Sequence, residues 1–223
     1  MRRSFLFAAA LLMGATVLPA AACSVVPGYR IPTTLQLVEQ ADLIVLARVE
    51  DGRGGTDDDP ELKLVPILTL KGVNPPPKLD MAGALETGNM RATPSDPTEI
   101  VRANPDAYTG ACNRYVFRRG ATLLLFFRRE GQGYVQISQP FARTAEDVTG
   151  IDSLWVRVVR EYIAIDEFPP ALRRARLAAR RDLLRTKADP ESRAIAADMD
   201  ATLNTVRKPL RAPLPPAPAE DRP

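Results

Sequence analysis

The spacing of the hydrophobic residues changes once along this chain, from a period of two to a period of 3.6, near residue 151. Before that point apolar and polar residues alternate in short runs, as in strands with one buried face. After it apolar residues recur every three to four positions, as in amphipathic helices. Strands followed by helices indicate an antiparallel sheet with a separate helical layer. We therefore expect a mainly β structure over residues 23–150 and a helical extension over 151–206.

The strand pattern is clearest in four runs, at residues 42–49, 61–70, 121–128 and 133–138, and weaker in KLDMAG (78–83). One side of the second run carries Leu62, Leu64, Leu68 and Leu70. Pro66 interrupts this run, which predicts an edge position or a bulge there. Between the strands, residues 84–111 have no strong period and several prolines, so they are expected to form a long irregular insertion.

Three signals predict where helices begin. Thr33 or Thr34 can cap a short helix, LQLVEQA. The run PPALRRARLAARRDLLRT (169–186) has proline in its first turn, where the missing N–H costs nothing. Asp189, followed by Pro190, predicts the start of the last helix. Residues 207–223 contain six prolines and little apolar surface to bury, so a disordered tail is expected.

The first 22 residues have the layout of a cleaved signal peptide. Two arginines precede an apolar run from Phe5 to Leu18, and Ala20-Ala21-Ala22 offers a cleavage site of the A-x-A type. Cleavage there would make Cys23 the first mature residue and would leave one of the three net positive charges. A periplasmic or secreted protein is expected. No later run approaches the roughly 18 apolar residues that a membrane-spanning helix needs.

Only two cysteines are present, Cys23 and Cys112. In an exported protein a pair of cysteines is typical of a disulfide, and this one would close a loop of about 90 residues, worth at most about 4–5 kcal/mol. The alternative is an envelope lipoprotein with a lipid on Cys23. The residues before Cys23 lack the leucine usually found three positions ahead of a lipidated cysteine. We expect the disulfide, and the lipoprotein remains the alternative.

The composition offers little to a catalytic or metal site. The chain has no histidine, which removes the commonest general base and zinc ligand. No glycine-rich phosphate cradle or dinucleotide fingerprint occurs, and the acidic run 57–59 lacks the alternating spacing of a calcium loop. We therefore expect no enzyme, no catalytic residues, no metal and no cofactor. Export argues against a nucleic-acid partner and leaves a protein partner as the expectation.

Six arginines load the predicted helix 169–186 with positive charge. Such a helix fits either a peripheral membrane contact or a solvated face on a packed helix. We expect the solvated face. The arginines are Arg173, Arg174, Arg176, Arg180, Arg181 and Arg185.

Several motifs between residues 23 and 146 resemble netrin-like domains, the group that includes the tissue inhibitors of metalloproteinases. They are CSVVPGYR at the expected mature start, the Ala-Asp step before LIVLARVED, the strand LKLVPILTLKGV ending in Lys-Gly, CNRYVFRRGATLLLFFRREG, and the Arg-Thr of FARTAED. The resemblance implies a five-stranded oligonucleotide-binding-type (OB) barrel. We accordingly expect the strand runs to form one closed or nearly closed antiparallel barrel, with core residues that include Val45, Leu68, Leu123 and Leu125.

The resemblance also implies a role for the mature N-terminus. In metalloproteinase inhibitors the α-amino group and carbonyl of the first cysteine chelate the enzyme's zinc, which would place Cys23 and Ser24 in that role. This chain departs from the family pattern because Val25 stands where the inhibitors have their second cysteine, and no cysteine precedes Arg143-Thr144. We therefore expect Cys23 to staple the N-terminal segment to the barrel, with inhibition as an alternative.

Overall fold

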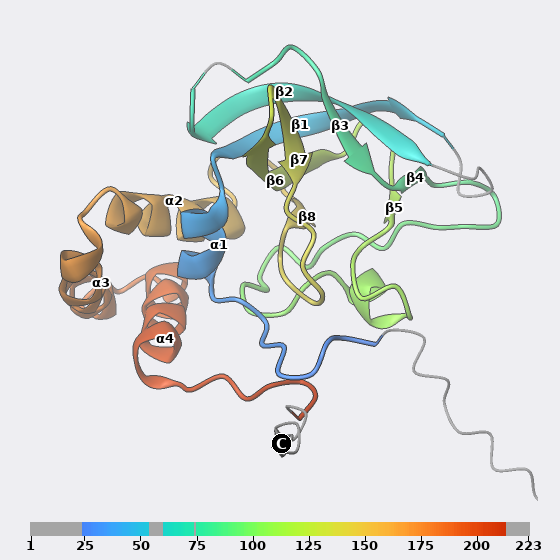
Figure 1. Ribbon diagram of the computed structural model, residues 1–223. Coiled ribbons are helices and arrows are strands. Elements are labelled where there is room, and N and C mark those ends of the chain that lie inside the picture. Colours follow the sequence, from blue (N-terminus) through green and yellow to red (C-terminus); the bar gives the residue numbers. More distant parts are fainter. Residues whose placement is uncertain (1–23, 54–59, 74, 213–223) are drawn as a thin grey trace, which may run out of the picture.

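An antiparallel sheet with a layer of helices beside it forms the protein (Figure 1). The computed structural model describes residues 24–53, 60–73 and 75–212. The main sheet has the order β3-β2-β1-β6-β7, and β8 pairs with β6. Its strands are β1 (Leu43–Gly52), β2 (Glu61–Lys71), β3 (Leu79–Ala82), β6 (Thr122–Glu130), β7 (Gly133–Gln136) and β8 (Ala145–Asp147). Two short strands, β4 (Ala84–Leu85) and β5 (Val116–Phe117), pair in parallel apart from it. The expected mainly antiparallel sheet with C-terminal helices is confirmed.

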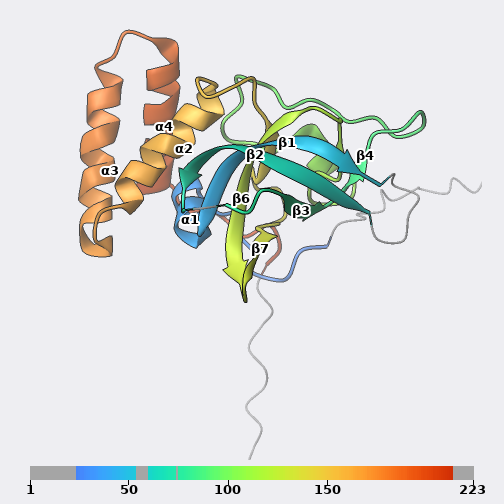
Figure 2. The same ribbon diagram turned by 90° about the horizontal axis from the view of Figure 1, so that it is seen from above.

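The helices are α1 (Thr34–Gln40), α2 (Leu154–Asp166), α3 (Pro170–Arg185) and α4 (Pro190–Asn204). The starts predicted for α1, α3 and α4 are confirmed. Thr33 caps α1 through a capping box with Gln36, and Asp189 accepts a hydrogen bond from the backbone N–H of Ser192 at the start of α4. Each cap satisfies backbone donors that a helix start leaves without partners. The helical layer lies to one side of the sheet, as the view from above makes plain (Figure 2).

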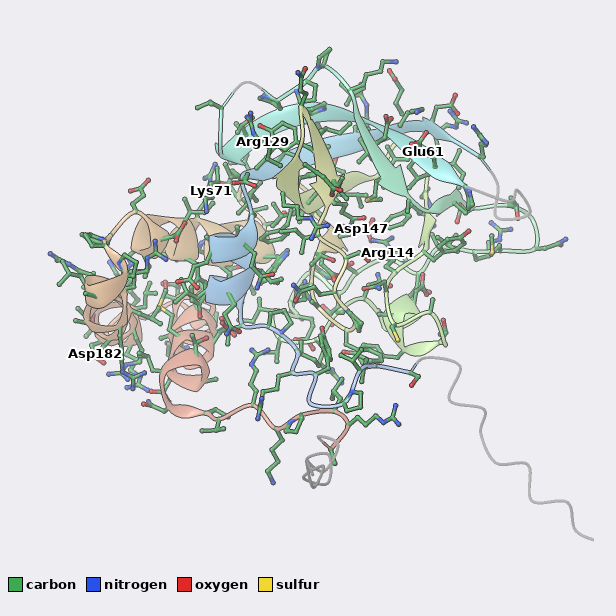
Figure 3. All side chains as sticks on the ribbon, in the orientation of Figure 1. Glu61, Lys71, Arg114, Arg129, Asp147 and Asp182 are labelled. Carbon is green, nitrogen blue, oxygen red and sulfur yellow. The ribbon has the colours of Figure 1, made fainter. Side chains whose placement is uncertain are left out.

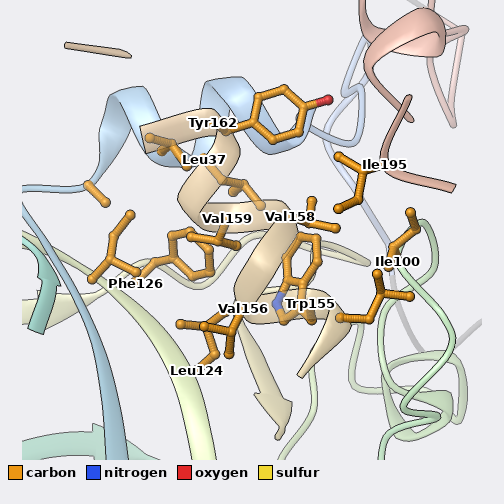
Figure 4. Packing of buried hydrophobic residues seen from close by; sticks show 14 of the residues in the cluster. Leu37, Ile100, Leu124, Phe126, Trp155, Val156, Val158, Val159, Tyr162 and Ile195 are labelled. Carbon is orange, nitrogen blue, oxygen red and sulfur yellow. The ribbon is translucent and has the colours of Figure 1, made fainter. Parts of the chain in front are cut away.

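Both faces of the central strand β1 are buried over its first five residues, 43–47. One face packs with alternate residues of β2, β3 and β6 in a cluster that we call the sheet core, to which β1 contributes Leu43, Val45, Ala47 and Val49. The opposite face packs on the helices in a second cluster, the helical core, to which β1 contributes Ile44 and Leu46. Leu124 and Phe126 of β6 meet Trp155, Val156 and Val159 of α2 there (Figure 4). Over residues 43–47 β1 therefore has no exposed face, whereas Arg48 and Glu50 further along the strand are exposed.

The sheet core confirms three of the four predicted core residues and corrects the fourth. Val45, Leu123 and Leu125 are fully buried in it. Leu68 instead packs against the helical core. The cause is a bulge, because Leu46 pairs with Leu68 while Ala47 pairs with Pro66, so that one residue is skipped. An extra residue moves every later side chain to the other face. The bulge predicted from Pro66 is confirmed.

The hydrogen-bonded sheet is open between β3 and β7. Among the described residues no backbone pairing joins these two strands, so the expected closed barrel is not found. β3 pairs only with the first four residues of β2. The two strands nevertheless approach each other, with Cα pairs within 8 Å. The sheet thus curves until its ends meet without completing the ladder.

Two segments expected to be irregular are held in place. Residues 84–111 include β4 and a short 3-10 helix, η1 (Pro105–Tyr108), and their Ile100 packs beside Trp155 (Figure 4). Residues 207–211 run beside residues 28–32 (Figure 1), and the backbone N–H of Leu210 donates to Tyr29 O at 2.9 Å. The predicted tail therefore begins too early, because residues 207–212 are ordered by these contacts. Residues 213–223 lie outside the described part.

Candidate functional site

Two acidic residues of β8 hold the long insertion against the sheet. The carboxylate of Glu146, 1% exposed, accepts hydrogen bonds from Ser95 Oγ at 2.6 Å and from the backbone N–H of Asn104 at 3.0 Å. Asp147 accepts from the backbone N–H of Ser95 at 2.8 Å. The Asn104 side chain donates in turn to Ser95 Oγ at 3.0 Å. Because each buried polar group here has a partner, this network fixes the loop rigidly on β8.

A buried arginine, Arg114, links two strands next to this network. The guanidinium of Arg114 forms an ion pair with Asp147 at 2.7 Å (Figure 3). It also lies 4.6 Å from the ring centre of Phe117. Its Nε donates to Val116 O at 3.3 Å and its Nη1 to Ala145 O at 3.3 Å. Arg114 therefore ties β5 to β8.

Arg143 is buried to the same degree but is only partly satisfied. Its side chain is 4% exposed, and its guanidinium lies 4.6 Å from the centre of the Trp155 ring. Nη1 donates to Arg102 O, whereas Nη2 is 3.7 Å from Glu146 Oε2, which is beyond hydrogen-bond distance. Nε has no hydrogen-bond partner among the described residues. Burial lowers the pKa of Arg143, and the nearby carboxylate of Glu146 opposes that shift.

Arg143 and Glu146 line a cavity that we call the insertion cavity. It encloses about 330 Å³ between the insertion and β8. Its other ionisable walls are Asp96, Glu99, Arg102 and Tyr108. Glu99 accepts a hydrogen bond from Arg102 Nε at 2.8 Å, so these two charges largely compensate each other. A hydrogen bond from the Thr98 hydroxyl, followed by one from its backbone N–H, lowers the pKa of Asp96 and keeps it ionised at neutral pH.

The predicted N-terminal site is described only in part. Cys23 lies outside the described residues, so its disulfide with Cys112 and its zinc-chelating role stay predictions. Ser24 is exposed, and its hydroxyl lies 3.5 Å from Arg211 Nη1. Cys112 is buried, has a φ of 61°, and its carbonyl accepts a hydrogen bond from the backbone N–H of Phe141 at 2.7 Å. Within the described ranges no group of three potential metal ligands is found.

The arginines of α3 are largely compensated within the molecule. Arg173 pairs with Glu39 and Asp166, and Arg180 pairs with Glu161 at 2.5 Å. Arg181 and Arg185 both pair with Asp200 of α4. Arg176 lies over the ring of Phe168. The positive charge seen in the sequence is therefore shared with acids from α1, α2 and α4. In the described part of the chain no helix is long and apolar enough to cross a membrane.

Comparison with protein-family models and with curated protein sequences finds no match for this chain. The insertion cavity therefore rests on geometry alone. From the sequence, Arg143 was noticed only as part of the Arg-Thr motif, and no role was predicted for Asp96 or Glu146. The one indication in the sequence that Arg143 is buried was its setting in FARTAED, where small and apolar residues stand next to this charge.

Proposed function

We propose that this protein is a non-enzymatic, exported binding module whose ligand occupies the insertion cavity. The observation that carries the proposal is the partly satisfied, buried guanidinium of Arg143 in the wall of that cavity. Ligand sites are concave and present a few fixed polar groups. Here the hydrogen bonds of Glu146 to Ser95 and Asn104 fix the cavity walls before any ligand arrives. The signal-like first 22 residues support export.

The sheet of this module is proposed to be a partly open OB-type barrel. The close approach of β3 and β7 supports this, as does the cluster of buried side chains that β1, β2, β3 and β6 enclose. OB folds are five-stranded barrels that are only partly closed, and they bind ligands with one sheet face and its neighbouring loops. A binding loop supported on a rigid sheet suits that use.

Two alternatives concern the N-terminus. An envelope lipoprotein would carry a lipid on Cys23, and a metalloprotease inhibitor would present the free amine of Cys23 to an enzyme's zinc. The exposure of Ser24 is compatible with both. Residues 28 and 29 are held by backbone hydrogen bonds to residues 210 and 211, so either role would be exerted by the short stretch before them.

Intact mass and non-reducing peptide mapping of the mature protein from its native envelope test the N-terminus. The proposal predicts a chain that starts at or beside Cys23, with its thiol linked to Cys112. A mass increased by acyl chains would establish the lipoprotein instead.

Native mass spectrometry of the same preparation tests the binding function. We expect a non-covalent complex that is lost on denaturation and is also lost in Ala103→Leu, which places extra methyl groups in the cavity wall. Ala188→Leu, far along the chain between α3 and α4, serves as the control and should keep the complex. A wild-type protein that carries neither ligand nor partner in native extract would contradict the proposal, as would a complex that Ala103→Leu leaves intact.

A further inference from the structure

We infer that a second cavity, which we call the arginine cavity, recognises a phosphate group carried by a small molecule or by a lipid headgroup. It encloses about 340 Å³ between residues 92 and 94 of the insertion, residues 118–122 and the end of β8. Among the described residues, none lines both this cavity and the insertion cavity. The inference is therefore independent of the ligand proposed for the insertion cavity.

A fixed turn presents two arginines to this cavity. The turn begins at Arg118, whose carbonyl accepts a hydrogen bond from the backbone N–H of Ala121 at 3.1 Å. Gly120, the third residue of the turn, has a φ of 80°, as a type II turn requires. The backbone N–H of Gly120 donates to Val49 O at 2.8 Å, and that of Val49 donates to Ala121 O at 2.9 Å. The turn that carries Arg118 and Arg119 is thus anchored on β1 before any ligand arrives.

Several hydrogen-bond donors in the arginine cavity have no partner within the described chain. Arg118 meets a single acid, by a hydrogen bond of 3.3 Å from its Nε to Glu86 Oε1, and its side chain is 58% exposed. Its Nη1 and Nη2 donate to no described residue. Arg119 uses Nη1 and Nη2 on β1 and keeps its Nε. The hydroxyl of Thr122, which also lines the cavity, has no hydrogen-bond partner among the described residues.

The origin of these donors fits a phosphate better than a carboxylate. A carboxylate has two oxygens in one plane, which a single planar fork of an arginine can satisfy. A phosphate ester presents three strong acceptor oxygens that point in different directions. It can therefore accept from donors on three separate side chains, as Arg118, Arg119 and Thr122 provide them in this cavity.

The charge of the arginine cavity also favours an anion. Three arginines and one acid line it, which gives two net positive charges. The acid is paired with Arg114 at 2.7 Å, so the surplus lies on Arg118 and Arg119. Glu86 and Asp51 pair with these two arginines from outside the lining, and they reduce the surplus without using every N–H group. A phosphate, which carries a charge of about −1.5 to −2 at pH 7, gains more from this surplus than a carboxylate does.

Calorimetric titration of the full chain at neutral pH and low salt tests the site. The probes are inorganic phosphate, glycerol phosphate and acetate, and the phosphorus NMR line width of glycerol phosphate gives an independent readout. We expect saturable binding of glycerol phosphate that weakens as salt is added, and acetate binding at least about tenfold weaker. Sedimentation with vesicles of phosphatidic acid, with phosphatidylcholine vesicles as the control, shows whether a lipid headgroup also supplies the phosphate.

Two variants and a matched control test the assigned residues. Arg118→Gln removes a charged donor and should weaken phosphate binding about tenfold to hundredfold. Glu86→Gln removes the acid that competes for Arg118 and should tighten phosphate binding. Arg128→Gln is the control, because Arg128 is likewise an exposed arginine that pairs with an acid at 3.3 Å, and it should leave phosphate binding unchanged. Circular dichroism and thermal melting establish that each variant is folded.

The results that would overturn the inference are distinct. Acetate that binds as tightly as phosphate would overturn the inferred ligand class. Equal weakening by Arg118→Gln and Arg128→Gln would trace the binding to general surface charge and overturn the assigned site. A wild type that binds neither the soluble phosphates nor phosphatidic acid vesicles would overturn the inference as a whole. The proposed binding function stands or falls separately, on the complexes found in native extract.

Discussion

Arg207 offers a sharp test of how the two ends of the described chain are joined. Its Nη1 donates to Ile31 O at 3.0 Å and to Pro32 O at 2.7 Å, and its carbonyl accepts from Arg30 Nε at 2.9 Å. Arg207→Ala removes the two bonds made by the guanidinium and leaves two partly buried carbonyls without that donor. A hydrogen bond to a charged group contributes about 1.5–3 kcal/mol, and partial solvent access to these carbonyls reduces the cost of losing both. We therefore expect a loss of about 2 kcal/mol.

For a chain of this size that loss lowers the melting temperature by about 4–8 °C. Urea unfolding should show a lower midpoint with an unchanged slope. Hydrogen exchange should accelerate first at the amides of Gly28 and Leu210, which donate across the two segments. Lys208→Ala is the matched control, since Lys208 is exposed, and should change stability by less than about 0.5 kcal/mol. If Arg207→Ala unfolds at the wild-type urea midpoint and the amides of Gly28 and Leu210 stay protected, the hydrogen bonds of Arg207 contribute nothing to stability.

Three further predictions address the core, a buried acid and the N-terminus. Leu125→Asp should abolish soluble folding, because it places a charge in the sheet core. The control Ile67→Asp, at the exposed bulge, should fold. A soluble and stable Leu125→Asp protein would refute the placement of β6. Burial raises the pKa of Asp198 in the folded protein above its unfolded value of about 3.9. As the pH falls through the folded-state pKa towards that value, the wild type should therefore gain stability relative to Asp198→Asn. Urea midpoints of the two proteins that change equally with pH would contradict this. If the protein inhibits a metalloprotease through Cys23, one added N-terminal alanine should eliminate inhibition without unfolding it, and surviving inhibition would rule out zinc chelation by that amine.

The change of hydrophobic period was enough to predict the sheet and the helical layer, because secondary structure follows local patterns. Thr33 and Asp189 carry their capping function within three residues, so the sequence alone locates the starts of α1 and α4. These predictions needed no knowledge of the rest of the chain.

Features that depend on distant partners were not predictable. The reversal of Leu68 required the register between β1 and β2, which a proline alone does not specify. Arg143 could not be identified as buried, because arginine is mostly exposed and its partners come from the insertion and from α2. The closure of the sheet likewise depends on β3 and β7, which lie more than fifty residues apart.

The charge of α3 also depends on distant partners that a sequence does not reveal. Six arginines on one helix indicate a basic surface, yet four of them pair with acids from three other helices. These acids are Glu39, Glu161, Asp166 and Asp200. Only the packing of those helices shows that the surface is largely compensated. A prediction of membrane contact from sequence counts the arginines and misses the acids that reach them.

The pairing of residues 28–32 with residues 207–211 has a consequence for the order in which the protein can mature. The two segments are separated by about 177 positions, as for Arg30 and Arg207, and residues 207–211 are synthesised after all the residues between them. Residues 28–32 therefore remain without this partner until those intervening residues have emerged. Contacts of such long sequence separation form late, because the chain between them must be ordered first. If the chain is exported with its N-terminus first, this one contact can form only after residues 207–211 have also crossed the membrane.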